Sequence, residues 1–154
     1  MASQDNPKTV ELYGFGPQHE ATALGTITPG MLVERAPGGV QAHGTVGGPA
    51  TAQFANEYGM TGRTIRDDYI ADDNVIFTSY VDGSGIYAVV AAGAAAIAES
   101  DLLASAGDGT LKVAGDAEVA VARALDELDN SGASETARLR VETISAQRTA
   151  AAAT

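Results

Sequence analysis

Short runs of alternating apolar and polar residues, separated by glycine-rich turns, make up most of this chain. The clearest run is residues 74–81, NVIFTSYV, in which β-branched and aromatic residues predominate. Such runs, about four to eight residues long, are typical of strands. We therefore expect an all-β fold, a small β-barrel or β-sandwich. The expected strands are residues 9–16, 31–35, 40–44, 51–55, 74–81, 86–93, 118–125 and 137–144.

The alternation is interrupted in two polar segments, residues 17–25 and 60–74, which we expect to be surface loops. The alanine-rich segment Ala91–Ala98 has the composition of a helix but directly follows a strand, so both structures are open there. We expect residues 1–8 to be a flexible N-terminal arm and residues 9–145 to form the β domain. Residues 146–154 are expected to be a low-complexity, disordered C-terminal tail.

Two stretches of the chain resemble each other. Residues 32–42, LVERAPGGVQA, and residues 102–113, LLASAGDGTLKV, both place a small-residue turn between an apolar pair and an alternating segment. Glycine-rich turns of this kind are typical of hairpins. The two stretches align when one residue is inserted near Thr110. This similarity indicates a duplicated β unit with halves at about 22–81 and 85–144, although coincidence between two common hairpins is the alternative.

Composition limits the function further. The chain has 154 residues and no cysteine, which excludes disulfides and thiolate chemistry. Its formal net charge of −11 opposes nucleic-acid binding, which requires a basic surface. No apolar run reaches the roughly 18 residues of a membrane span, and the N-terminus does not have the pattern of a signal peptide. We therefore expect a protein made in the cytoplasm that binds neither membranes nor nucleic acid.

The sequence offers no arrangement of residues that is typical of an enzyme. His19 and His43 are the only histidines, and no nucleophile-elbow motif accompanies them. The acidic segment 66–74, RDDYIADDN, is rich in oxygen ligands but does not have the spacing of an EF-hand. We expect it to be a solvated loop, and we expect no catalytic residue, metal or cofactor.

The second half of the chain resembles the small cement or decoration proteins of tailed double-stranded DNA viruses. The similarity includes residues 101–113, residues 120–132 and the closing strand ARLRVETI. In the first half, the segment GTITPGMLVER is similar to the matching part of that pattern. The resemblance covers roughly residues 20–145 and depends on glycines and apolar positions. The glycine that usually precedes the second of these strands is replaced here by Ala122 or Arg123.

The resemblance implies a structural protein of the virion. Such proteins, found in bacteriophages and archaeal viruses, bind the outer surface of an icosahedral capsid after synthesis in the host cytoplasm. They are often homotrimers, and they stabilise contacts between subunits of the major capsid protein. The partners implied here are therefore the major capsid protein and further copies of this chain.

An apolar segment that follows the N-terminal arm supplies the candidate contacts with the capsid or a neighbouring subunit. These candidates are Val10, Leu12, Tyr13 and Phe15. Tyr13 and Phe15 either anchor the core of this chain or pack against a neighbouring subunit, as aromatic side chains at interfaces often do. The alternative function is that of a surface-displayed β module which binds carbohydrate or a host receptor. The absence of tryptophan argues against carbohydrate binding, because sugars usually stack on aromatic rings.

Overall fold

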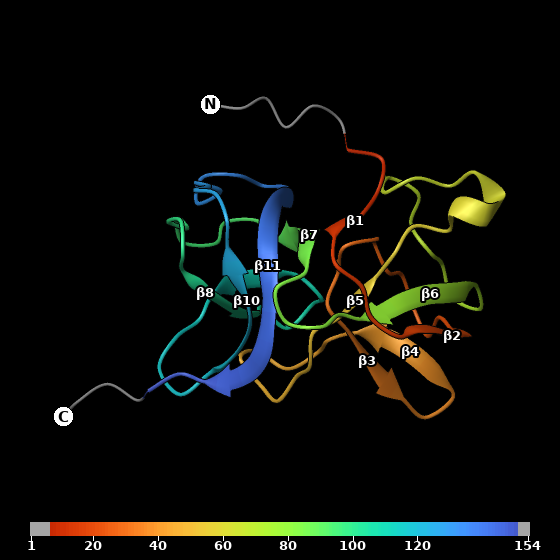
Figure 1. Ribbon diagram of the computed structural model, residues 1–154, viewed down its shortest axis with the longest axis horizontal. Helices are drawn as coiled ribbons and strands as arrows, with labels where there is room; N and C mark the ends of the chain where they lie inside the picture. The colour runs from red at the N-terminus through yellow and green to blue at the C-terminus, as the bar shows by residue number, and fades with distance from the viewer. Residues whose placement is uncertain (1–6, 151–154) are drawn as a thin grey trace.

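The computed structural model describes residues 7–150 and confirms the all-β class. These residues form eleven strands and one short 3-10 helix, η1 (Gly59–Thr61), with no α-helix (Figure 1). The strands are β1 (Glu11–Tyr13), β2 (Gln18–Thr22), β3 (Val33–Ala36), β4 (Gly39–Ala42), β5 (Gln53–Ala55), β6 (Asn74–Ser79), β7 (Gly85–Val90), β8 (Leu102–Ser105), β9 (Leu111–Val113), β10 (Val119–Ala124) and β11 (Ala137–Arg148).

Strands β7–β11 form a ring, here named the C-terminal unit. The ring runs β7–β11–β10–β8–β9 through antiparallel pairs, and a parallel contact between Val90 of β7 and Leu111 of β9 closes it. Strand β1 pairs with β7 and so extends the sheet at the side of the ring that faces the other half of the molecule (Figure 1). The ring leaves β1 as an edge strand of this sheet.

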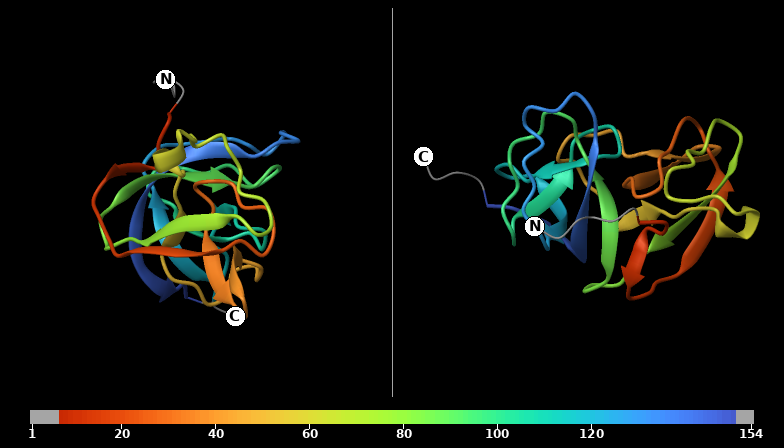
Figure 2. Two further views of the ribbon diagram at one scale, coloured as in Figure 1. Left: turned by 90° about the vertical axis from the view of Figure 1, so that its right-hand side faces the viewer. Right: turned by 90° about the horizontal axis from the view of Figure 1, so that it is seen from above.

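Strands β2–β6, the N-terminal unit, repeat this pairing order. β2 pairs with β6, β6 with β5, and β3 with β4, as β7 pairs with β11, β11 with β10, and β8 with β9. Two isolated bridges complete the correspondence. The Leu32–Phe54 bridge, next to β3 and β5, corresponds to the pairing of β8 with β10. The parallel Ala23–Val40 bridge corresponds to the parallel contact between Val90 and Leu111. The two units therefore share one topology, and they lie side by side (Figure 2).

The two similar hairpins of the sequence occupy equivalent places in these units. In the first, β3 and β4 pair Val33 with Ala42, and in the second, β8 and β9 pair Leu103 with Val113. The second hairpin is longer by one residue, in the turn that contains Thr110, where the sequence alignment requires its insertion. The common topology supports a duplicated unit, whose evolutionary origin remains a hypothesis.

Two segments differ from the expectation because their structure depends on distant partners. Residues 18–22, expected to be part of a loop, form β2, a largely exposed strand whose register is set by pairing with β6. Strand β11 continues to Arg148, which pairs with Val119, so the predicted tail at residues 146–154 begins too early. Residues 1–6 of the predicted arm and 151–154 of the tail lie outside the described residues.

The structure also shows the conformation of two segments that the sequence left open or placed at the surface. The alanine-rich segment Ala91–Ala98 contains turns and a single bridge from Ile97 to Leu128, and it contains no helix. The long loop before β6 is less exposed than expected, because Ile65 and Tyr69 point into the core. The Tyr69 hydroxyl donates to the Asn56 carbonyl at 2.7 Å, and burial raises the pKa of Tyr69 to about 12.

The core has two parts. A smaller cluster, which includes Val75 and Phe77, lies within the N-terminal unit. The larger cluster is shared: it joins Leu32 and Phe54 of the N-terminal unit to side chains such as Leu103 of the C-terminal unit. Burying apolar area from both units in one cluster makes the stability of each depend on the other.

Equivalent turns before β3 and β8 illustrate both the repeat and its departures. The amide of Met31 donates to the carbonyl of Thr28, and that of Asp101 donates to the carbonyl of Ala98. The third residue of each turn has a positive φ, 95° at Gly30 and 76° at Ser100. At Gly30 a Cβ atom would lie 2.6 Å from the carbonyl oxygen of Tyr87, so close packing between the units requires glycine.

Exchanging the residue types at these two positions is expected to change stability in opposite directions. Ser100→Gly relieves a left-handed conformation and should stabilise the fold by about 0.5–1 kcal/mol. Gly30→Ser forces a side chain against Tyr87 and should cost about 2–4 kcal/mol. Chemical unfolding measured by circular dichroism tests both. Equal changes in the free energy of unfolding for the two variants would contradict the conclusion that close packing of Gly30 against Tyr87 requires glycine.

Candidate functional site

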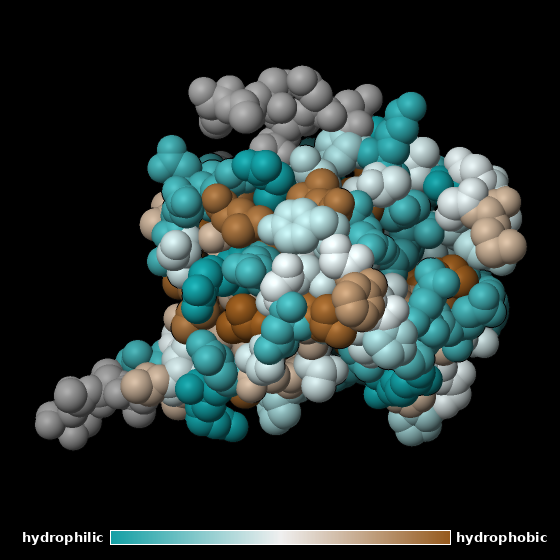
Figure 3. Space-filling view, in the orientation of Figure 1, coloured by the Kyte–Doolittle hydropathy of each residue, from teal (hydrophilic) through white to brown (hydrophobic). Residues whose placement is uncertain are grey.

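The candidate contact residues lie on and beside β1. Tyr13 pairs with Gly85 of β7, and its ring lies over that glycine: a Cβ atom on Gly85 would be 2.4 Å from the ring. The surface around β1, β7 and β11 carries apolar side chains in the middle of one face of the molecule (Figure 3). Hydrophilic side chains surround these apolar patches.

The backbone after β1 is firmly held. Val81 donates its amide to the Phe15 carbonyl at 3.0 Å, and Ser79 donates to the Pro17 carbonyl at 3.0 Å. A Cβ atom on Gly16 would lie 1.9 Å from the Ser79 carbonyl oxygen at the end of β6. The backbone of Gly16 therefore lies so close to β6 that no residue other than glycine fits there. The Phe15 side chain, 71% exposed, is thus presented by a backbone with little freedom. Such an anchor loses little conformational entropy on binding.

Three of the four candidate residues are exposed and one is not. Leu12 is 39% exposed and Tyr13 is 50% exposed, and we give the name β1 surface to these two residues together with Phe15 and Val81, whose amide bonds the Phe15 carbonyl. Val10 is fully buried in the shared core, so its side chain is not accessible to a partner. The amide of Val10 is also occupied, by a hydrogen bond of 2.9 Å to the Glu57 carboxylate.

His43 is brought together with a serine and a carboxylate that are distant in the sequence. Its Nδ1 lies 2.8 Å from the Ser105 hydroxyl, and its Nε2 lies 2.9 Å from the Pro49 carbonyl oxygen and 3.6 Å from the Glu34 carboxylate. His43 and Ser105 are each only 1% exposed. With no access for a substrate at the hydroxyl, this arrangement is suited to linking the two units rather than to nucleophilic catalysis.

The other polar residues considered in the sequence have structural partners. His19 Nε2 lies 3.0 Å from the Ser79 hydroxyl on the β2–β6 pair. In the acidic segment, Asp67 accepts a hydrogen bond of 2.6 Å from the Thr64 amide. Asp73 accepts from the Ile70 amide, and this bond lowers the pKa of Asp73. Within residues 7–150, no group of three or more potential ligands has the geometry of a metal site.

A second surface feature is a cavity between the ends of β3 and β5. The cavity measures about 350 Å³ and is lined by residues that include Arg35, His43, Ala50 and Thr51. In the described residues, the Leu32–Phe54 bridge is the pairing recorded between the segments of β3 and β5, and the cavity lies beyond it. We call this cavity the open gap.

In the C-terminal unit, the equivalent position between β8 and β10 is filled. The turn at residues 45–48 enters it from the N-terminal unit: Gly47 donates to the Ser105 carbonyl at 2.9 Å and accepts from the Val119 amide at 2.9 Å. We call this the filled gap and residues 45–48 the first turn. Sequence reasoning did not find either gap, because both depend on how far paired strands separate.

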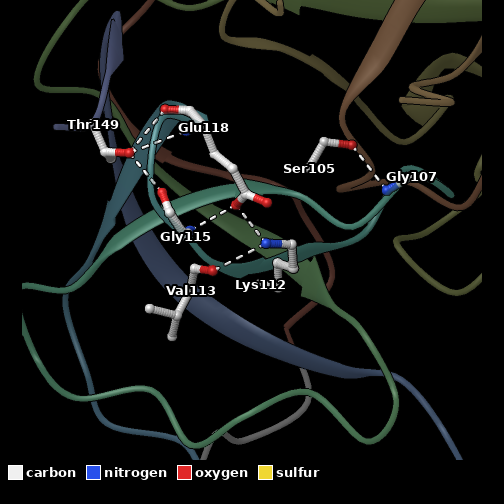
Figure 4. A network of polar contacts seen from close by, with 7 residues as sticks. All are labelled: Ser105, Gly107, Lys112, Val113, Gly115, Glu118 and Thr149. Atoms are coloured by element: carbon white, nitrogen blue, oxygen red, sulfur yellow. Dashed lines mark hydrogen bonds and ion pairs between the residues drawn. The ribbon is translucent and has the colours of Figure 1, made fainter. Parts of the chain in front are cut away.

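The filled gap is bordered by a polar network. Glu118 accepts hydrogen bonds from Lys112 and from the Gly115 amide, while Thr149 on the extension of β11 bonds the Gly115 carbonyl (Figure 4). The bond from Lys112 is the main cause of the lowered pKa of Glu118. These contacts hold residues 115–118, which we call the second turn, against the end of β11.

The chain's sequence matches no protein-family model, and no curated protein is significantly similar to it. In residues 7–150, no helix has the length and apolar character that crossing a membrane requires.

Proposed function

We propose that this protein is a structural component of a virion that binds the outer surface of an icosahedral capsid and stabilises contacts between major capsid protein subunits. The observation that carries the proposal is the β1 surface. It combines an exposed aromatic anchor, Phe15 at 71% exposure, with an edge strand and a firmly held backbone. The sequence resemblance to decoration proteins supplies the identity of the partner.

The physical properties of the β1 surface suit this role. An edge strand presents backbone groups that can pair with a strand of a partner, and neighbouring side chains then give specificity. Aromatic side chains surrounded by polar residues are typical of interface hot spots. The net charge of −11 favours solubility of the free chain before assembly.

Capsid binding can be tested with shells assembled from the major capsid protein of the genome that encodes this chain. We expect the full chain to sediment with these shells and to appear on their outer surface in electron micrographs. Phe15→Ser should weaken binding about tenfold or more, because it removes the most exposed aromatic anchor. Shells that bind no wild-type chain would overturn the proposal.

A matched variant controls for the loss of any exposed apolar residue. Met60 on η1 is 88% exposed and does not belong to the β1 surface. Met60→Ser should bind shells like the wild type. Equal losses of binding in the two variants would place the contact elsewhere.

A further inference from the structure

The open gap runs along the edge of strand β3. Three consecutive residues of this strand line it: Val33, Glu34 and Arg35. Because neighbouring side chains of a strand point to opposite faces, a cavity lined by three residues in a row lies beside the backbone of the strand. Residues 49–51, also consecutive, line the opposite side. The open gap of about 350 Å³ is therefore a slot between two stretches of backbone.

The hydrogen-bonding pattern of the β3–β4 hairpin directs backbone groups of β3 into this slot. His43 donates its amide to the Leu32 carbonyl at 3.0 Å, so this pair and every second pair after it are the bonded pairs of the hairpin. The amide and carbonyl of Arg35 belong to a pair between these, with Val40, and they point away from β4. Within the described part of the chain, residues 49–52 make no backbone hydrogen bond with β3. Arg35 thus offers a donor and an acceptor to a further segment.

Both sides of the open gap are held in place. Strand β3 is paired along its other edge with β4. On the far side, the Nε2 atom of His43 lies 2.9 Å from the Pro49 carbonyl oxygen. The Ala52 carbonyl accepts a hydrogen bond of 3.0 Å from the Tyr80 amide. A segment that enters the open gap therefore meets a preformed site, which favours binding.

The filled gap shows what kind of occupant such a slot accepts. It lies between β8 and β10, the counterparts of β3 and β5, and the first turn inserts the buried residue Gly47 into it. The amide of Gly47 donates to the Ser105 carbonyl, and its carbonyl accepts from the Val119 amide, at 2.9 Å each. A Cβ atom on Gly47 would lie 2.3 Å from the Glu118 side chain. The occupant is thus held through its backbone, with a small residue at the point of entry.

The side chain of Arg35 indicates the charge of a segment that would suit the open gap. The exposed guanidinium lies 5.1 Å from the ring centre of Phe77, and none of the ion pairs within residues 7–150 includes it. The neighbouring carboxylate of Glu34 accepts hydrogen bonds from the Gln41 side chain at 3.0 Å and from the Gly44 amide at 3.2 Å. A carboxylate supplied by the occupant would therefore complete the pairing of Arg35.

We infer that the open gap binds an extended acidic segment of the major capsid protein, as a second capsid contact of this chain; the inference rests on the proposed function. The backbone of the segment pairs with that of Arg35, and a carboxylate of the segment binds the guanidinium. The β1 surface extends the sheet of the C-terminal unit, whereas the open gap belongs to the N-terminal unit. One chain then contacts two capsid subunits at once, as stabilising the contact between them requires.

Hydrogen exchange of the full wild-type chain, free and bound to assembled shells, tests this contact. We expect amides in residues 33–36 and 49–52 to exchange about tenfold or more slowly on shells, because insertion gives them new partners. The 3-10 helix η1, outside both contact surfaces, is the internal reference and should exchange equally in the two states. If shells bind the chain and protect β1 but not residues 33–36, the inference is wrong and the proposed function stands. If shells do not bind the chain, both are wrong.

Charge reversal tests the acidic character of the occupant. Arg35→Glu should weaken shell binding about tenfold, because it places a carboxylate opposite an acidic segment. Arg35→Lys, which keeps the charge, should weaken it less. The matched control is Arg123→Glu, at an exposed arginine of β10 outside both surfaces, and it should bind like the wild type.

Circular dichroism monitors the folding of these variants. If Arg35→Glu does not fold, the hydrogen exchange of the wild type decides. Shell binding by folded Arg35→Glu that equals wild-type binding would overturn the acidic occupant.

Discussion

Arg138→Met is expected to lower the free energy of unfolding by about 3–5 kcal/mol. Arg138 projects from β11 and donates to the Pro29 carbonyl at 2.6 Å and to the Ile65 carbonyl at 2.7 Å, both in the N-terminal unit. Burial lowers the pKa of Arg138 to about 10, so the side chain remains charged at neutral pH. Methionine fills similar space but leaves two carbonyls without a donor.

Thermal unfolding followed by circular dichroism measures this loss, which corresponds to a decrease in Tm of about 10 °C for a chain of this size. Arg123→Met is the matched control, because Arg123 is an exposed arginine on the neighbouring strand β10. It should leave Tm nearly unchanged. Equal Tm values for the two variants would show that the link from Arg138 to the N-terminal unit contributes little.

Phe54→Ala should be as costly, with a loss of about 3–5 kcal/mol, and should destabilise both units together. Phe54 is fully buried in the shared core, and its ring centre lies 6.4 Å from that of Tyr80. Removing the ring leaves a cavity bordered by side chains of both units. Hydrogen exchange of backbone amides measures where protection is lost, and we expect similar losses in β6 and β11.

Phe77→Ala is the comparison for this variant. Phe77 is equally buried, but it belongs to the cluster confined to the N-terminal unit. Its removal should reduce protection in β6 more than in β11. Loss of protection confined to the N-terminal unit in Phe54→Ala would mean that the two units unfold independently, contrary to the shared core.

The strands that could be predicted from the sequence are those whose signal is local. The run at residues 74–81 became β6, and the two glycine-turn stretches became the β3–β4 and β8–β9 hairpins. Turn residues and period-two alternation report directly on backbone conformation, which is why these elements were recognisable. The segment QHEAT has no such signal, and it forms β2 because β6 offers it an edge.

The same distinction applies to the candidate surface. The sequence left core packing and an interface role both open for Tyr13 and Phe15, and the structure leaves both side chains exposed while it buries Val10. Val10 precedes β1, and only the tertiary structure shows that the shared core covers it while all three residues of β1 remain exposed. Contact between these residues and a capsid remains a prediction.

The sequence by itself indicated the fold class, the local turns and the similarity of the two hairpins, because each depends on residues that are close in the chain. Only the tertiary structure decided the pairing of His43 with Ser105, the link from Arg138 to the N-terminal unit, and which of the two gaps is filled. These features depend on how two similar units are placed against each other. That placement results from a shared core and from a turn that reaches across, and neither leaves a local pattern in the chain.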